Sequence, residues 1–209
     1  MNLTYLGHAG FRLQSKEGVI YFDPYQIKKP INDGDIVLVS HSHRDHCDPE
    51  SILAVSKKDA VVIAAQNAAA KASAQHSVSE GNALSVGGFK ITAVPAYNTN
   101  KPFHPRGFGV GFIVEAEGKR IYHAGDTDAI NEMMEYGPVD VALLPVSGTY
   151  VMTAPEAAEA AKLVKAKLAI PMHYGEVIGS KDDAVFFKKL LERLNGKVVI
   201  LNVGESLDA

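Results

Sequence analysis

Cysteine is almost absent from the chain, because Cys47 is the only one among 209 residues. A single thiol excludes an internal disulfide and fits a reducing compartment. No apolar run approaches the roughly 20 residues that a membrane span requires. The N-terminal stretch MNLTYLGHAGFRL also lacks the basic region and pure apolar stretch of a signal peptide. These absences predict a cytoplasmic protein with no membrane partner.

Blocks of basic residues are missing as well. The net charge is -3, and the densest basic pairs, Lys28-Lys29 and Lys57-Lys58, are isolated. Nucleic acid is therefore an unfavoured partner, while a homo-oligomer stays open. With 46% hydrophobic and 22% charged residues, the composition is ordinary for a globular protein. A core of this size needs no structural metal, so any metal ligands would serve function.

Apolar patterning predicts strands in meanders first and strands alternating with helices later, which indicates a mixed α/β (α+β) fold of packed sheets and helices. The expected strands cover residues 3–7, 10–15, 18–24, 35–40, 60–65, 89–96, a hairpin within 109–126, 139–146, 167–171 and 197–201. The expected helices cover residues 50–58, 67–74, 128–137, 154–166 and 182–194. Thr153 and Glu156 have the spacing of a capping box at the start of one helix.

The stretch HSHRDHCD, residues 41–48, holds three of the eight histidines directly after an apolar strand. His41, His43, Asp45 and His46 form the pattern H-x-H-x-D-H. A solvated polar loop, or histidines that bond helix-end groups, would be the ordinary explanation. In that case, bringing four such polar groups so close together would cost desolvation free energy without a compensating partner. Neutral imidazoles with a carboxylate suit zinc, and also iron or manganese.

Two further residues of the metal-binding types, an aspartate and a histidine, follow strands elsewhere in the chain. Asp126 lies in a Gly-Asp-Thr turn after one strand, and His173 follows another strand in PMHYG. Alone, they would be an ordinary turn residue and a loop histidine. Loops at the carboxyl ends of strands in α/β sheets converge on one crevice, so both are candidate metal ligands beside the histidine cluster.

These motifs together carry a resemblance to a known family. The segments YLGHAGFRL, YFDPY, VSHSHRDHCD, IYHAGDTD and IPMHYG appear in the order typical of the metallo-β-lactamase fold superfamily. The chain resembles its small metal-dependent hydrolases, such as the ascorbate-6-phosphate lactonase and the N-acyl-phosphatidylethanolamine phospholipase. This resemblance implies one domain over residues 1–209, a four-layer αββα sandwich of two similar halves. It also implies one or two divalent ions, Zn²⁺ first, with Mn²⁺ or Fe²⁺ as alternatives.

The resemblance also implies roles for particular residues. His41 and His43 would bind one ion, and Asp45, His46 and His173 the other, with Asp126 bridging both. Asp45 would in addition orient the nucleophilic water and so act as the catalytic residue. The superfamily normally supplies a third histidine to the first ion, at the position where this chain has Asn98. Either His104 reaches back to fill that position, or the first ion is weakly held.

Four other side chains are candidates for supporting roles. His8, Asn98 and Tyr150 are candidate substrate-binding residues, with His8 alternatively behind the ligands and Tyr150 a donor to a substrate oxyanion. Asp23 could accept a hydrogen bond from a ligand histidine, or merely cap a turn before Pro24.

The leading functional hypothesis is a hydrolase that uses metal-activated water on an ester, lactone or phosphodiester bond of a small molecule. Fold alone does not set the substrate. A nuclease of the same fold is the first alternative, which the missing basic patch opposes. A metal-binding or regulatory protein without turnover is the second, and Asn98 gives it some support.

Overall fold

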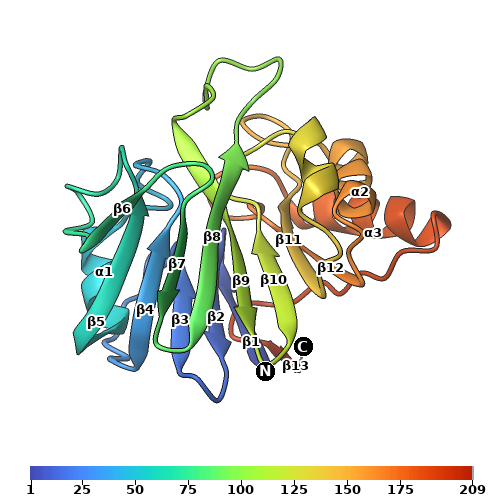
Figure 1. Ribbon diagram of the computed structural model, residues 1–209. Coiled ribbons are helices and arrows are strands. Elements are labelled where there is room, and N and C mark those ends of the chain that lie inside the picture. The colour runs from blue at the N-terminus through green and yellow to red at the C-terminus, as the bar shows by residue number, and fades with distance from the viewer. Residues whose placement is uncertain (209) are drawn as a thin grey trace.

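A computed structural model describes residues 1–208, which form two facing β-sheets (Figure 1). The first, sheet A, has seven strands in the order β13-β1-β2-β3-β4-β5-β6. Their bounds are β1 (Asn2–Gly7), β2 (Gly10–Gln14), β3 (Val19–Phe22), β4 (Gly34–Val39), β5 (Ser56–Ala65), β6 (His76–Val78) and β13 (Ser206–Asp208). Strands β3 to β6 run parallel, and the remaining pairs are antiparallel.

The second, sheet B, has six strands in the order β12-β11-β10-β9-β8-β7. Their bounds are β7 (Ala83–Val86), β8 (Phe89–Ala96), β9 (Gly109–Ala116), β10 (Lys119–His123), β11 (Val141–Pro145) and β12 (Leu168–Met172). Strands β10, β11 and β12 are parallel, whereas β7 to β10 form antiparallel pairs. The helices are α1 (Pro49–Val55), the 3-10 helix η1 (Asn131–Glu135), α2 (Ala154–Leu163) and α3 (Lys181–Arg193).

Period-two alternation in sheet A separates two apolar layers. In β4, Ile36 and Leu38 belong to the core between the sheets, whereas Val37 and Val39 pack beneath α1 on the opposite face. Sheet B carries α2 against β11 and α3 against β12 on its outer side. The layers are therefore helix, sheet, sheet and helix, which confirms the predicted αββα sandwich.

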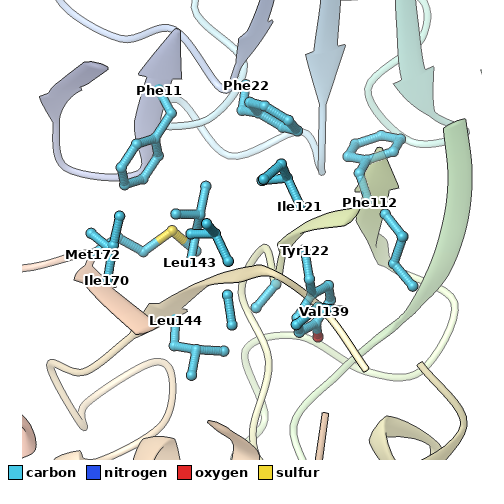
Figure 2. Packing of buried hydrophobic residues seen from close by; sticks show 14 of the residues in the cluster. Phe11, Phe22, Phe112, Ile121, Tyr122, Val139, Leu143, Leu144, Ile170 and Met172 are labelled. Atoms are coloured by element: carbon cyan, nitrogen blue, oxygen red, sulfur yellow. The ribbon is translucent and has the colours of Figure 1, made fainter. Parts of the chain in front are cut away.

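The core between the sheets consists of large side chains with almost no exposed surface. Figure 2 shows Phe11 and Phe22 of sheet A above Ile121, Leu143 and Met172 of sheet B, and each is at most 1% exposed. Burial of such side chains stabilises a fold by about 1.5–3 kcal/mol each. This packing holds the two sheets at a fixed separation.

Two glycines allow the sheets to approach at the end where β4 finishes. A Cβ added to Gly109 would lie 2.9 Å from the Cβ of His41, and one added to Gly125 would lie 2.8 Å from the Val110 carbonyl oxygen. The Val110 amide donates to the Ser40 carbonyl at 2.9 Å, which joins β9 to the chain just after β4. Larger residues at either position would separate the loops that follow β4 and β10.

Several sequence predictions of secondary structure need correction. The predicted helix over residues 67–74 is wrong, because this segment forms successive turns. Its small alanine side chains bury little apolar surface, and backbone bonding of Gln75 to Val62 draws the chain back into the sheet. The predicted helix over residues 128–137 is only the short 3-10 helix η1.

The predicted strand over residues 197–201 is also wrong, since only one bridge joins Val198 to Ala169. The Val198 carbonyl accepts from the side chain of Lys188 at 2.8 Å and not from another strand. The capping box of Thr153 and Glu156 is confirmed at the start of α2. The described residues contain no helix long and apolar enough to cross a membrane.

Candidate metal centre

Five loops meet at one end of the two sheets, and each leaves the carboxyl end of a strand. These strands are β1 and β4 in sheet A and β8, β10 and β12 in sheet B. They deliver the candidate residues His8, His41, His43, Asp45, His46, His104, Asp126 and His173. The loops of a sheet converge at the carboxyl ends of its co-directional strands, so residues far apart in sequence become neighbours.

The first group of candidate ligands contains three imidazoles and one carboxylate. Its members, with all ligand atoms within 4.8 Å of one another, are His41, His43, His104 and Asp126. Nδ1 of His43 lies 3.1 Å from Nε2 of His41 and 3.1 Å from Nε2 of His104. Oδ2 of Asp126 lies 3.3 Å from Nε2 of His104. His104 therefore lies beside His41, His43 and Asp126, which keeps it as the candidate for the third histidine of this group.

The second group contains three imidazoles and the carboxylate of Asp45. Its members are His8, Asp45, His46 and His173, again within 4.8 Å. Oδ2 of Asp45 lies 3.7 Å from Nε2 of His46 and 3.8 Å from Nε2 of His173. Asp126 also reaches this group, at 3.2 Å from Nε2 of both His46 and His173. One carboxylate thus faces both groups.

Buried polar atoms without partners indicate that these groups suit metal ions. Within residues 1–208, Nε2 of His46, Nε2 of His173 and Oδ1 of Asp126 have no hydrogen-bond partner although they are shielded from solvent. Such atoms cost about 1–3 kcal/mol each when nothing pairs with them. Both nitrogens lie 3.2 Å from an oxygen of Asp126, and imidazole nitrogen with carboxylate oxygen is a donor set for zinc, iron or manganese. The residues present therefore fit divalent cations.

Protonation states in the groups follow from burial and neighbouring charge. Burial, together with the charge of His46, holds the pKa of His41 well below its usual value, so this imidazole is neutral and able to bind a metal. Burial alone would raise the pKa of Asp126, but the charges of His173 and His46 hold it well below its usual value. Asp126 is therefore an ionised carboxylate at neutral pH.

Each of four imidazoles has its second nitrogen occupied by a polar partner. Nδ1 of His46 donates to Asp23 at 2.7 Å, and Nδ1 of His41 lies 3.0 Å from the Ser40 hydroxyl, which itself donates to Asp23. Nδ1 of His173 lies 3.1 Å from the Ser147 hydroxyl. These contacts leave Nε2 free and fix the ring orientation, as metal-binding histidines require. The hydrogen bond predicted for Asp23 is confirmed.

The fourth of these contacts explains Asn98. Oδ1 of Asn98 accepts from Nδ1 of His104 at 3.1 Å and from its backbone amide at 3.0 Å. The Asn98 amide nitrogen donates to Asp128 at 3.1 Å and to the Tyr150 carbonyl at 3.0 Å. These bonds occupy both the oxygen and the nitrogen of the Asn98 amide. Asn98 is not among the residues that line the cavity beside the two groups. These bonds place Asn98 behind His104, and the expectation that it contacts substrate stays a prediction.

The other two candidates for substrate binding differ in their placement. His8 is fully buried, and its Nε2 donates to Oδ2 of Asp45 at 2.8 Å, so it supports that carboxylate and does not line the cavity. Tyr150 does line the cavity. His123 packs against Phe22 and bonds the Ala9 carbonyl, away from both groups.

Sequence reasoning missed two residues that hold the ligand rings, Ser40 and Ser147. Ser40 directly precedes His41, and Ser147 follows β11 at the same end of sheet B as His173. A small hydroxyl residue after a core strand is a weak signal, because turns use the same residues. Only their position at the carboxyl ends of β4 and β11 could have singled them out.

Three residues around the centre hold unusual backbone conformations. His8, Asp23 and His173 have φ angles of 50°, 39° and 60°, in the left-handed region that favours glycine. Such conformations cost on the order of 1–3 kcal/mol each and persist where the surrounding structure imposes them. The His173 amide, for example, donates to the His8 carbonyl at 2.7 Å.

Comparison with known proteins agrees with this architecture. Residues 2–173 match the family described as the β-lactamase superfamily domain. The solved structure of a metal-dependent hydrolase from Parabacteroides distasonis has a TM-score of 0.84 and 34% identity, covering 95% of this chain and 91% of that one. The metallo hydrolase Igni18 from Ignicoccus hospitalis has a TM-score of 0.80 and 26% identity, with coverage of 99% and 97%. The chain therefore belongs to the β-lactamase superfamily, as the motifs predicted.

Two relatives of known sequence identify the family within this superfamily. The UPF0173 metal-dependent hydrolase from Methanoregula boonei is 37% identical over 221 residues, with 100% of this chain and 98% of the relative covered. Another from Pyrococcus furiosus is 34% identical, with coverage of 100% and 99%. Within the superfamily, the chain belongs to the UPF0173 family of metal-dependent hydrolases. The predicted enzyme class is thereby confirmed.

Proposed function

We propose that the chain hydrolyses an ester, lactone or phosphodiester bond of a small molecule at a centre for two divalent ions. The observation that carries this proposal is that both ligand groups share Asp126 and face one cavity of about 170 Å³. A cavity of this size suits a small substrate and not a folded macromolecule.

The proposed ligands divide into two sets. His41, His43 and His104 would hold one ion, and Asp45, His46 and His173 the other, with Asp126 offering an oxygen to each. His8 lies within the second group but donates Nε2 to Asp45, so it orients that carboxylate. Five imidazole nitrogen donors favour Zn²⁺, with Mn²⁺ and Fe²⁺ as alternatives.

Bound divalent ions would lower the pKa of a water molecule and polarise the substrate oxygen that becomes negatively charged. The protein's own contribution centres on Asp45, which lines the cavity and has a side chain 20% exposed. Burial alone would raise the pKa of Asp45, but the hydrogen bond from His8 and the charge of His46 lower it. Asp45 is then ionised at neutral pH and can accept a hydrogen bond from the attacking water.

Tyr150 is the proposed donor to the substrate. Its ring lines the same cavity as Asp45, on the side formed by the loop between β11 and α2. A phenol there can donate a hydrogen bond to an oxygen that gains charge in the transition state. Asp45 and Tyr150 would thus act on opposite partners of the reaction, the water and the leaving or carbonyl oxygen.

Metal analysis combined with an activity screen tests the proposal. The protein, reconstituted with Zn²⁺, Mn²⁺ or Fe²⁺, is assayed on bis-p-nitrophenyl phosphate, p-nitrophenyl esters and lactones. Two ions per chain with turnover on any of them supports the proposal. Tight metal binding without turnover would instead favour a binding protein. The contacts of His104 with His43 and Asp126 weaken the support that Asn98 gave to that alternative.

The contact between Asn98 and His104 gives a prediction about metal affinity. Asn98→Ala removes the acceptor for Nδ1 of His104, so the affinity of the first group for zinc should fall about 10–100-fold, the usual effect of losing such a partner. The second group should keep its ion. Competition against a colorimetric chelator measures both affinities.

A conservative variant and a control variant accompany Asn98→Ala. Asn98→Asp retains an acceptor for the His104 ring and should keep more of the affinity than Asn98→Ala does. Asn82→Ala removes an asparagine that caps the Ser79 amide in another loop, and it should behave as the wild type. Equal weakening of both groups in Asn98→Ala would contradict the role given to Asn98.

A further inference from the structure

Apart from the Tyr150 hydroxyl, the wall of the cavity that is not made of candidate ligands is apolar. Besides five candidate ligands, the lining residues are Phe103, Tyr150 and Val177. Phe103 is 42% exposed and Val177 is 47% exposed, so two large apolar side chains face solvent beside a polar centre. Exposed apolar residues that gather at one cavity indicate a binding surface, whereas single scattered ones do not.

The three side chains come from three different loops. Phe103 lies between β8 and β9, Tyr150 between β11 and α2, and Val177 between β12 and α3. The rings of Phe103 and Tyr150 meet edge to face, with centroids 4.7 Å apart and planes at 87°. This geometry is a favoured one for aromatic pairs and gives the wall a defined shape.

Hydrogen bonds tie this wall to the first ligand group. The Tyr150 carbonyl accepts from the side chain of Asn98 at 3.0 Å and lies 3.2 Å from Nδ1 of His104. Phe103 directly precedes His104 in the sequence. The apolar wall is therefore held at a fixed position relative to the reacting centre, which is what a substrate group next to the broken bond requires.

The wall offers no positive charge to a substrate. No lysine or arginine of residues 1–208 is among the residues that line the cavity. Lys101, in the same loop as Phe103, donates to Asp128 at 2.5 Å, and Arg106 pairs with Glu132 at 2.9 Å. A carboxylate or phosphate placed on this wall would lose hydration without gaining a partner, which is unfavourable.

We infer that the substrate is a carboxylic ester or lactone whose acyl part is a short uncharged hydrocarbon group, packed against Phe103, Tyr150 and Val177. This inference rests on the proposed function and narrows it to one bond type. Water adds to the acyl carbon, the acyl–oxygen bond breaks, and the products are a carboxylate and an alcohol. One proton of the water goes to the alcohol oxygen and the other to solvent. The cavity of about 170 Å³ limits the group to a short chain or one ring.

A homologous series of esters tests the inference. The zinc-loaded protein is assayed with p-nitrophenyl acetate, butyrate and hemisuccinate, and kcat/KM is measured for each. Full burial of one CH₂ changes an equilibrium by about fourfold, so butyrate, with two more CH₂ groups, should exceed acetate by about fifteenfold. Hemisuccinate, which ends in a carboxylate, should fall below butyrate by at least about tenfold. Bis-p-nitrophenyl phosphate should be the slowest substrate.

Variants locate the effect on the wall. Phe103→Ala should reduce the ratio of butyrate to acetate to about two, because the chain loses its packing surface. Val177→Lys should raise the ratio of hemisuccinate to butyrate by placing a cation on the wall. Phe186→Ala, at a half-exposed position on α3, is the matched control and should leave both ratios unchanged.

The outcomes separate the inference from the proposed function. If none of the esters, lactones and phosphodiesters is hydrolysed, the proposed function fails. If esters are hydrolysed but acetate equals butyrate, or hemisuccinate is preferred, only the inference is overturned. It is also overturned if the phosphodiester is the best substrate, or if Phe103→Ala leaves the butyrate preference intact.

Discussion

Asp45→Ala should lower kcat about 10³-fold on the best substrate of the screen while leaving the fold intact. Asp45 is the proposed partner of the attacking water, and positioned proton acceptors typically contribute 10²–10⁴-fold. Its side chain belongs to no apolar cluster, so its loss should not disturb the core. Steady-state kinetics give the rate, and circular dichroism with a thermal melt reports the fold.

A control distinguishes this effect from a general change of charge. Asp59→Ala removes a carboxylate from an exposed position in β5, far from the five loops, and it should retain the wild-type rate. Asp45→Asn should also be strongly impaired, because an amide cannot accept the proton. An Asp45→Ala variant with the wild-type kcat would show that the catalytic assignment is wrong.

Asp126→Asn should release metal from both ligand groups. Among the described residues 1–208, Asp126 is the one carboxylate whose oxygens lie 3.2–3.3 Å from imidazoles of both groups, namely His46, His104 and His173. Asparagine keeps the size but removes the charge, so metal bound after dialysis should fall from about two ions to below about one per chain. Elemental analysis measures the content.

Thermal melts give an independent measure of the same change. A ligand present at 1,000 times its Kd stabilises a fold by about 4.1 kcal/mol, so a chelator should lower the melting temperature of the wild type. The chelator should have little effect on Asp126→Asn, which has less metal to lose. Asp35→Asn, which alters a carboxylate at the opposite end of β4, should respond as the wild type does. Retention of two ions by Asp126→Asn would contradict the bridging role.

The centre was predictable from the sequence where ligands follow core strands directly. His41, His43, Asp45 and His46 come within seven residues of the end of β4, and Asp126 and His173 come soon after β10 and β12. The apolar pattern of a strand shows where the strand ends. The residues that follow it then lie at the edge of the sheet where the carboxyl ends of the strands meet. Sequence spacing therefore singled out these candidate ligands, which the structure brings together.

The position of His104 beside this centre could not be predicted from strand ends. It stands eight residues after β8, within a loop whose path depends on the bonds of Asn98 to Asp128 and to the Tyr150 carbonyl. Those partners are 30 and 52 residues away in the chain, and no local pattern encodes such contacts. For the same reason the sequence left open what Asn98 does, whereas the structure shows its side chain bonded to the ring and amide of His104.

The secondary structure that the sequence did not predict correctly also depends on contacts between distant parts of the chain. The strand β13 pairs with β1 across about the whole length of the chain, and its three residues carry no recognisable pattern. The alanine-rich segment after β5 has high helix propensity, yet the return of the chain to β6 prevails over it. Short elements set by distant pairing are the part of this fold that propensity cannot supply.

The left-handed backbone at His8, Asp23 and His173 means that stability and catalysis favour different residues at the same positions. Glycine at any of the three would relieve the backbone but would delete an imidazole or a carboxylate that the centre uses. Laboratory selection for heat resistance alone should accordingly enrich glycine at these sites and yield tougher, inactive proteins. Selection that also demands turnover should leave them untouched and find its improvements elsewhere in the sandwich.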